Sequence, residues 1–154
     1  MKVNINKDID SLRQETYVIT KLTKLPIPGI DALHDFSDLM VKVMQEHEGL
    51  GLAAPQINVP LKAIVISRKE VGLPSLFIAN PVITKSKGTS YKEEGCLSFP
   101  GVFIKIRRPA EIKVKGINQY FVPVQYTFTG TEARRACHEI DHLEGKLIID
   151  YKEE

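Results

Sequence analysis

The segment His138-Glu139-Ile140-Asp141-His142 places two histidines four residues apart, with a glutamate directly after the first. If the segment is helical, both imidazoles lie on one face and can bind a single metal ion from adjacent turns. The Glu139 carboxylate then lies where it can meet a metal-bound water without being a ligand itself. Five matched positions seldom arise by chance, so the pattern predicts metal-assisted hydrolysis rather than two unrelated surface histidines. It does not indicate which bond is hydrolysed.

A catalytic metal site of this kind needs a third protein ligand from elsewhere in the chain. No histidine follows His142, and only four carboxylates remain downstream of it. Upstream, Cys96 stands in Glu94-Gly95-Cys96-Leu97-Ser98, beside glycine-containing turns that leave a thiolate accessible. A lone cysteine is more often a small buried hydrophobic residue, so position alone does not assign Cys96 as a ligand.

A third segment, Gly49-Leu-Gly-Leu-Ala-Ala-Pro-Gln56, combines two glycines and two alanines with a terminal glutamine. Small residues let another backbone approach closely, as a substrate strand or a helix would, and Gln56 offers an amide donor. Tight packing of a loop on the core explains the same composition equally well. The segment lacks the Gly-Lys-Ser/Thr ending of a phosphate-binding loop.

Together the three segments resemble the peptide deformylase family. That family carries a glycine- and alanine-rich segment ending in glutamine, then Glu-Gly-Cys-apolar-Ser, then His-Glu-apolar-Asp-His. Here the segments are Gly49–Gln56, Glu94–Ser98 and His138–His142, in the same order, and the resemblance extends from about Asp31 to Tyr151. It implies a metal-dependent hydrolase that removes the formyl group from the N-terminal methionine of nascent polypeptides and releases formate.

The resemblance also implies how the metal and the water are handled. Cys96, His138 and His142 would hold one divalent metal ion, with a water in the fourth position. That water would attack the formyl carbon, while Glu139 acts as general base and then as general acid toward the leaving amine. The family typically uses Fe²⁺ in the cell, and Zn²⁺ or Ni²⁺ can occupy the same ligands. A Cys-His-His set suits several of these metals, so the sequence does not choose among them.

The remaining matched positions would contact the substrate, an N-formyl-methionyl peptide or nascent chain. Oxyanion charge would be shared by the metal, the Gln56 side-chain amide and the Leu97 backbone N–H. The peptide main chain is expected to pair as an added strand with the backbones of Leu50, Gly51 and Gly95. A side chain at position 95 would block that approaching strand.

Two positions beside the metal motif depart from the family pattern. Cys137 stands where glutamine is usual, and on a helix it points about 100° away from His138, so we expect a semi-buried thiol rather than a fourth ligand. Arg135 stands where an apolar residue normally helps to wall the methionine pocket, and it is therefore a substrate-binding candidate. Its stem can lie along the pocket with the charge outside. If the charge enters the pocket instead, the preference for methionine changes.

Glu94 resembles the family acid that pairs with a basic residue further along the chain. Arg108 fits that spacing, and Arg107 is the alternative. Both arginines can equally belong to a solvated strand edge.

Two helices are expected to frame the site. The first begins with Asp31 as its N-cap and runs to about Glu48, because apolar residues recur at spacings of three and four. The second begins near Gly130-Thr131, with Thr129 or Thr131 as its cap, runs to about Leu143 and carries the histidine motif. Gly145 is expected to close it.

Strands are expected between and after these helices. The run 63–67 predicts a buried strand, and 76–79 predicts another that ends at Asn80-Pro81 and continues through 82–84 into a hairpin at Lys87-Gly88. Helix, strand meander and helix in this order predict an α+β fold, with antiparallel sheets packed around the C-terminal helix. The further expected strands are 103–106, 111–116, 120–126 and 147–149.

Composition excludes several classes of protein. The chain has 154 residues, with 43% hydrophobic and 26% charged, and no window approaches the roughly 20 apolar residues that span a membrane. We expect one catalytic domain over residues 1–154. A net charge of +2 gives no strong indication of specific nucleic acid binding. Two cysteines, Cys96 and Cys137, are no disulfide scaffold, so a reducing cytoplasm is expected.

Two other functions fit part of the pattern. A metallopeptidase shares His-Glu-x-x-His on a helix, but Glu-Gly-Cys-Leu-Ser supplies an upstream cysteine, which disfavours it. A metal-stabilised module that binds nascent chains at the ribosome is the non-enzymatic alternative, with transient ribosome association through a basic cluster. A general base such as Glu139 would serve no purpose there. The cluster comprises Lys105, Arg107, Arg108, Lys113 and Lys115.

Overall fold

The computed structural model describes residues 3–154, which form three α-helices and seven strands in two sheets. The helices are α1 (Ile9–Leu12), α2 (Leu33–Glu46) and α3 (Gly130–Leu143). The large sheet has the order β1-β2-β3-β6-β7, and the strands β4 and β5 pair separately as a two-stranded ribbon. All strand pairs are antiparallel, which confirms the predicted α+β class.

The strand bounds are β1 (Gly51–Ala53), β2 (Ala63–Arg68), β3 (Leu73–Lys87), β4 (Ser90–Cys96), β5 (Phe99–Arg108), β6 (Glu111–Ile117) and β7 (Pro123–Thr129). Three short 3-10 helices, η1 (Ala54–Ile57), η2 (Lys69–Val71) and η3 (Ile148–Asp150), follow β1, β2 and α3. No helix within the described residues is long and apolar enough to cross a membrane.

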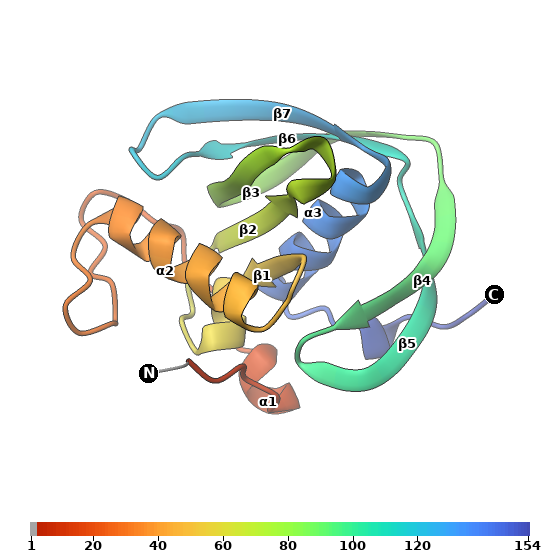
Figure 1. The fold of residues 1–154 in the computed structure, drawn as a ribbon, viewed down its shortest axis with the longest axis horizontal. Helices are drawn as coiled ribbons and strands as arrows, with labels where there is room; N and C mark the ends of the chain where they lie inside the picture. Colours follow the sequence, from red (N-terminus) through yellow and green to blue (C-terminus); the bar gives the residue numbers. More distant parts are fainter. Residues whose placement is uncertain (1–2) are drawn as a thin grey trace.

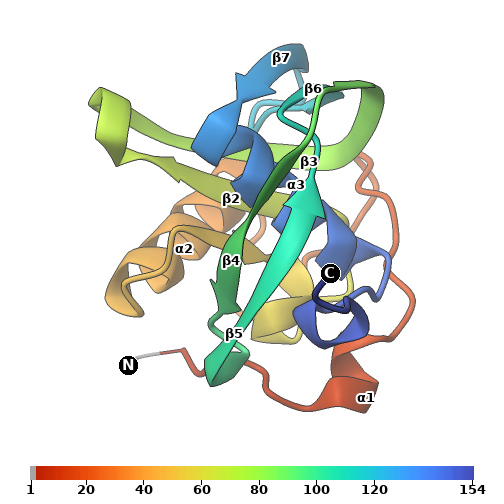
Figure 2. The ribbon, with the colours of Figure 1, turned by 90° about the vertical axis from the view of Figure 1, so that its right-hand side faces the viewer.

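Helix α3 lies near the centre of the molecule, between the large sheet and the β4–β5 ribbon, whereas α2 covers the other face of the sheet (Figure 1). Seen from the side, the ribbon crosses in front of α3 (Figure 2). The two helices therefore build two separate hydrophobic cores, one on each face of β1–β3.

Strand β2 is the layer that both cores share. Its residues alternate, with Ala63 and Val65 packed in the α2 core and Ile64 and Ile66 in the α3 core. A strand covered on both faces needs apolar residues at every position. This explains why the continuous run correctly predicted a buried strand.

The two predicted helices are present, with small differences at their ends. The N-cap of α2 is Ala32 rather than Asp31, and its apolar stripe is buried against the sheet, as predicted. The helix ends at Glu46, and the chain turns at Glu48, which has a positive φ of 57°. Helix α3 has Thr129 as its N-cap and ends at Leu143, as predicted.

Two strand predictions were wrong, and the strand expected at 120–126 is found three residues later, as β7. Strand β3 does not end at Asn80-Pro81 but runs on to Lys87, because its first half pairs with β2 and its second half with β6. No hairpin forms at Lys87-Gly88, since the chain leaves the large sheet there and enters the β4–β5 ribbon. The expected terminal strand at 147–149 is instead η3, whose Asp150 side chain accepts a hydrogen bond from Leu147 N at 2.9 Å.

An ion pair joins the N-terminal segment to the end of the chain. The Arg13 guanidinium donates to both carboxylate oxygens of Asp150, at 2.8 and 2.7 Å, and to the carbonyl of Gly145 at 3.1 Å. The positive φ of 71° at Gly145 forms the turn after α3 that brings this carbonyl toward Arg13.

Candidate metal centre and substrate cavity

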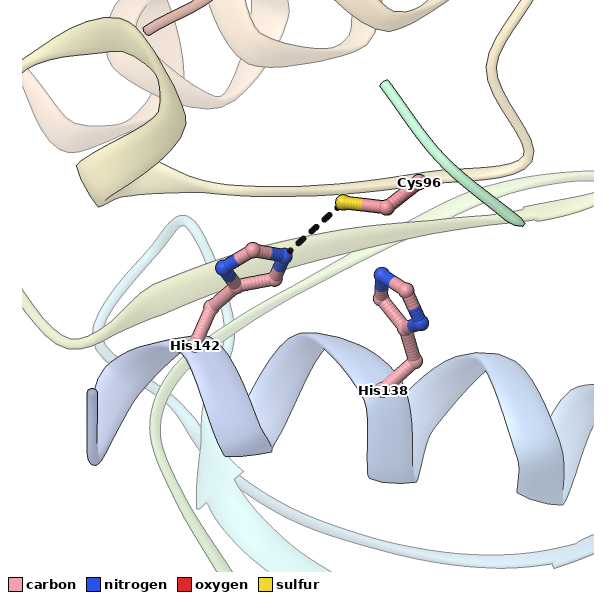
Figure 3. A group of neighbouring side chains, drawn as sticks. All are labelled: Cys96, His138 and His142. Atoms are coloured by element: carbon pink, nitrogen blue, oxygen red, sulfur yellow. Dashed lines mark hydrogen bonds between the residues drawn. The ribbon is translucent and has the colours of Figure 1, made fainter. Parts of the chain in front are cut away.

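The structure brings together the three residues predicted to bind metal. The ligand atoms of Cys96, His138 and His142 all lie within 4.8 Å of one another, and Cys96 Sγ is 3.4 Å from His142 Nε2. Both imidazoles project from adjacent turns of α3 toward the thiol, which comes from the end of β4 (Figure 3). A sulfur and two nitrogens converging on one point fit a zinc-type or iron-type divalent ion.

Local irregularity in the ribbon places the thiol. The pairing of β4 with β5 shifts register between Glu94 and Cys96, directly at Gly95. Such a shift re-aims the following side chain. A Cβ at Gly95 would lie 2.9 Å from the ring of Phe103, so glycine permits this close packing of the ribbon.

Glu94 is the buried carboxylate that orients the first histidine. Its Oε1 lies 2.9 Å from His138 Nδ1, so Nε2 is the ring nitrogen left for a metal. The Arg108 guanidinium donates two hydrogen bonds of 2.8 Å to Glu94, and Arg134 donates one of 2.6 Å. Burial would raise the pKa of Glu94, but the hydrogen bonds from Arg108 and His138 lower it to about 2. Glu94 is therefore ionised at any physiological pH.

The pairing of Glu94 with Arg108 confirms the first of the two predicted partners. Arg107, the alternative, instead pairs with Glu154 at the surface. Arg108 also donates to Asp141 Oδ2 at 2.6 Å and to the Tyr151 hydroxyl at 2.9 Å. This network fixes the C-terminal half of α3 to the ribbon and to Tyr151 near the end of the chain.

The electrostatic surroundings of the histidines fit a bound cation. Burial would lower the pKa of His138, but the charge of Glu139 and hydrogen bonds with Cys96 and Glu94 raise it well above the ordinary value. Burial, together with the charge of His138, lowers the pKa of His142 to about 3. The pocket thus stabilises positive charge at its centre while keeping His142 neutral, which is the form that binds metal.

Glu139 lies buried on α3 beside the metal ligands. Its Oε1 has no hydrogen-bond partner within residues 3–154. Burial raises the pKa of Glu139 to about 7, which suits a group that must both accept and release a proton near neutral pH. A Cβ at Gly51 would lie only 2.4 Å from Glu139 Oε2, so the first strand can pass this carboxylate only because position 51 is glycine.

Gln56 presents its amide donor to the metal centre. Its Oε1 accepts a hydrogen bond from Ala53 N at 2.9 Å, which fixes Nε2 on the opposite side. Nε2 lies 3.2 Å from Ser98 Oγ and 3.6 Å from Cys96 Sγ, and Ser98 in turn donates to Asn6 O at 2.7 Å. The orienting role of Ser98 and Asn6 was not predicted, because these contacts span distant parts of the sequence.

A cavity of about 700 Å³ opens beside the metal centre. Cys96, His138, Glu139 and Gln56 line one part of it. The four residues predicted to bind substrate also line it, namely Leu50, Gly51, Gly95 and Arg135, and so does Leu97, the predicted backbone donor to the oxyanion. The ten predicted site residues therefore occupy one region, with His142 packed behind the cavity wall.

Arg135 carries its charge away from this cavity. Its guanidinium donates to the Ser67 carbonyl at 2.9 Å and to both carboxylate oxygens of Glu70, at 2.7 and 2.5 Å. Neither Ser67 nor Glu70 lines the cavity, whereas Arg135 does, so the position of the guanidinium fits the first of the two predicted arrangements, with the charge outside. The role of Glu70 was not predicted, because nothing in the sequence links residue 70 to the helix.

Cys137 is buried on the sheet side of α3 and does not belong to the group of metal ligands. Burial raises the pKa of its thiol to about 11, so it stays protonated. The thiol is more deeply buried than the semi-buried thiol expected from the sequence.

Comparison with known proteins gives one consistent result. The sequence profile of the family described as Polypeptide deformylase matches residues 5–154. The chain is 39% identical, over 90% of its length and 88% of the relative's, to the peptide deformylase of Alkaliphilus metalliredigens. The crystal structure of peptide deformylase from Thermotoga maritima covers 100% of this chain and 99% of its own, with 33% identity and a TM-score of 0.85. A peptide deformylase structure from Legionella pneumophila gives a TM-score of 0.86 at 31% identity, covering 99% of this chain and 86% of its own.

Proposed function

The chain belongs to the peptide deformylase family, and from that premise we propose that the cavity beside α3 is its active site. The protein is a metal-dependent hydrolase that removes the N-formyl group from methionyl peptides and releases formate. One observation carries the placement of the site. Cys96 and His138, two of the three candidate ligands, and the buried Glu139 all line this one cavity.

Cys96, His138 and His142 hold the metal in this proposal, with Glu94 fixing the tautomer of His138. When bound, the metal would supply an activated water and would polarise the formyl oxygen. We propose Fe²⁺ as the metal in the cell, with Zn²⁺ or Ni²⁺ able to substitute, because one thiolate and two imidazoles accept all three. Metal analysis of protein purified without oxygen, before and after chelation, tests this assignment.

Glu139 moves the proton. Its Oε1 has no partner among the described residues, so it is available to accept a proton from the attacking water. The protonated carboxyl then donates to the amine nitrogen as the C–N bond of the formamide breaks. A pKa near 7 lets the same oxygen serve both steps without a large cost in either direction.

The developing oxyanion lies within reach of two donors in this arrangement. Gln56 Nε2 faces the centre because its Oε1 is held by Ala53 N. The Leu97 backbone N–H, next to the Cys96 ligand, is the second donor we propose. Donors fixed before the reaction stabilise the transition state without reorganisation.

The substrate main chain would pair along the open edge of β1. In the large sheet β1 has only β2 as a neighbour, and Leu50 and Gly51 line the cavity. Gly95 lies on the ribbon side of the same cavity. An extended peptide could therefore add as a strand that starts at Leu50 and Gly51 and approaches Gly95.

The test is formate release from a short formyl-methionyl peptide by protein loaded with Fe²⁺ without oxygen. We expect Glu139→Gln to lower kcat at least about 100-fold while metal content and unfolding stay unchanged, because only the proton carrier is lost. Glu93→Gln is the matched control, since Glu93 is an exposed carboxylate lining the same cavity. Turnover of unblocked peptides, or full activity of Glu139→Gln, would contradict the proposal.

We further propose that the enzyme works in the cytoplasm and meets nascent chains through transient ribosome association. The expected basic cluster does not hold together, because Arg108 is buried against Glu94 and Arg107 pairs with Glu154. Lys113 and Lys115 instead follow one face of β6, with Lys85 opposite Lys113. Like charges opposed across strands repel, and a phosphate backbone would relieve that repulsion.

Co-sedimentation with ribosomes at low salt tests this contact. Charge reversal of Lys85, Lys113 and Lys115 should abolish co-sedimentation and leave the turnover of free peptides unchanged. If the wild type and the charge-reversed variant sediment equally, the lysine face of β3 and β6 is not the ribosome contact.

A further inference from the structure

The buried arginine of the cavity wall is held by a single exposed carboxylate. Arg135 lies on α3 with only 9% of its side chain exposed, whereas the Glu70 side chain, on η2, is 48% exposed. The two make a bidentate pair through 2.7 and 2.5 Å hydrogen bonds, and Ser67 O accepts one more at 2.9 Å. A forked pair of this kind fixes the direction of the guanidinium as well as its charge.

The position of Arg135 places it next to the reacting centre. It lies three residues before His138 on α3, so their side chains are neighbours on one face of the helix. Both line the same cavity. The substrate group closest to the formyl carbon, the methionine side chain, is therefore the group that can reach the stem of Arg135.

Building on the proposed function, we propose that Glu70 is a positioning residue for side-chain selection. By holding the Arg135 guanidinium outside the cavity, Glu70 makes three methylenes of an arginine serve as an apolar wall for methionine. The long stem of arginine can cover apolar surface while its charge lies elsewhere. The Arg135 stem can serve as an apolar wall only while the guanidinium stays bound to Glu70.

Loss of Glu70 would leave the guanidinium with one neutral acceptor, the Ser67 carbonyl. A buried cation without its carboxylate is costly, and it moves toward water or toward another anion. The cavity is the open space that already lies beside the Arg135 stem. A guanidinium turned into it would compete with methionine and attract an acidic side chain.

The experiment compares formyl-methionyl and formyl-glutamyl peptides on the metal-loaded enzyme. For Glu70→Ala we expect KM for the methionyl peptide to rise about tenfold with kcat changed less than about twofold, because ground-state side-chain binding is affected rather than chemistry. The ratio of kcat/KM for the glutamyl to the methionyl peptide should rise about tenfold or more. In an Arg135→Leu background, Glu70→Ala should change neither value.

Glu132→Gln is the matched control. The Arg68–Glu132 pair also joins the end of β2 to α3, yet neither residue lines the cavity. A general loosening of α3 would move this control as much as Glu70→Ala. An effect on side-chain preference should appear with Glu70→Ala but not with Glu132→Gln. It should also disappear when Arg135 is replaced by leucine.

A binding measurement separates this inference from the proposed function. Peptide affinities are measured by calorimetry on metal-loaded Glu139→Gln protein, with and without Glu70→Ala. Weaker methionyl binding only with Glu70→Ala supports the inference whether or not turnover is observed. Unchanged affinity and unchanged KM would overturn it, and the assignment as a deformylase would stand on the wild-type assay alone.

Discussion

The ionisation of single residues at this site depends on the groups that surround them. Glu94 is ionised because Arg108 and His138 donate to it, and this carboxylate in turn orients His138. Glu139 has the opposite environment, since burial without a hydrogen-bond partner raises its pKa to about 7. Two glutamates in the same site therefore differ in pKa, because one accepts hydrogen bonds from charged donors and the other is buried without them.

Gly51 shows how closely a backbone must approach Glu139. A Cβ at this position would lie 2.4 Å from Glu139 Oε2, so Gly51→Ala forces the carboxylate to move. We expect kcat to fall about 100-fold, because a displaced general base no longer meets the water correctly. The assay is formate release at saturating peptide.

Gly95→Ala is the comparison for this prediction. The atoms nearest to its Cβ would all belong to the ring of Phe103, an exposed side chain that can shift. We expect kcat for Gly95→Ala to change much less than for Gly51→Ala, although peptide binding weakens. Equal losses of kcat in both variants would contradict a specific effect on Glu139.

At the level of helices and strands, the sequence predicted those elements that leave a local pattern of apolar residues. The periodicity of 33–47 and the motif at 138–142 predicted both helices, and apolar runs predicted β2 and the first half of β3. Strands β1 and β4 were not predicted. The partners of β3 were missed, because a strand that changes neighbours halfway leaves no signal in its own residues. The metal-ligand set came from the family resemblance, whereas Glu70 and Ser98 depend on tertiary contacts alone.

Strands β3 and β6 pack so closely that adding one methyl group at Gly116 should disturb their contact. A Cβ at Gly116 would lie 2.4 Å from Ile78 Cγ2 and 2.7 Å from Ala79 O. We expect Gly116→Ala to lower the free energy of unfolding by about 1–3 kcal/mol, because backbone and core cannot both yield. Urea unfolding measures this change. Lys115→Ala, an exposed neighbour on β6, should change stability by less than about 0.5 kcal/mol.

At the scale of the whole molecule, the chain is closed on itself by a few long-range contacts. Arg13 pairs with Asp150 and Gly145, and the Ser98 hydroxyl donates to Asn6 O. These contacts attach the N-terminal segment to the turn after α3 and to the ribbon. Segments near both ends of the described chain therefore pack against the elements that carry the metal ligands.

The Arg13–Asp150 pair gives a prediction for the acid side of the pH profile. The hydrogen bond from Arg13 lowers the pKa of Asp150 from 3.8 to about 2. A carboxylate whose pKa is lowered by folding stabilises the folded state at every pH above its pKa in the unfolded chain. That stabilisation is lost as pH falls from about 4 to about 2. The pair is partly exposed, so we expect about 0.5–1 kcal/mol at low salt.

Urea unfolding of wild type and Asp150→Asn between pH 7 and pH 2 measures this contribution. The two free energies should differ above pH 4 and converge toward pH 2. A constant difference over the whole range would show that the pair does not titrate as described.

The short edge of β1 also bears on how the protein behaves in concentrated solution. An unpaired strand edge that can receive a substrate strand can equally pair with another protein molecule, which is how edge strands start aggregation. Here the edge is three residues long, Gly51–Ala53, and it lies beside the cavity rather than on an open flat surface. Occupying the cavity with a peptide should therefore slow aggregation during storage or heating, in addition to any gain in equilibrium stability.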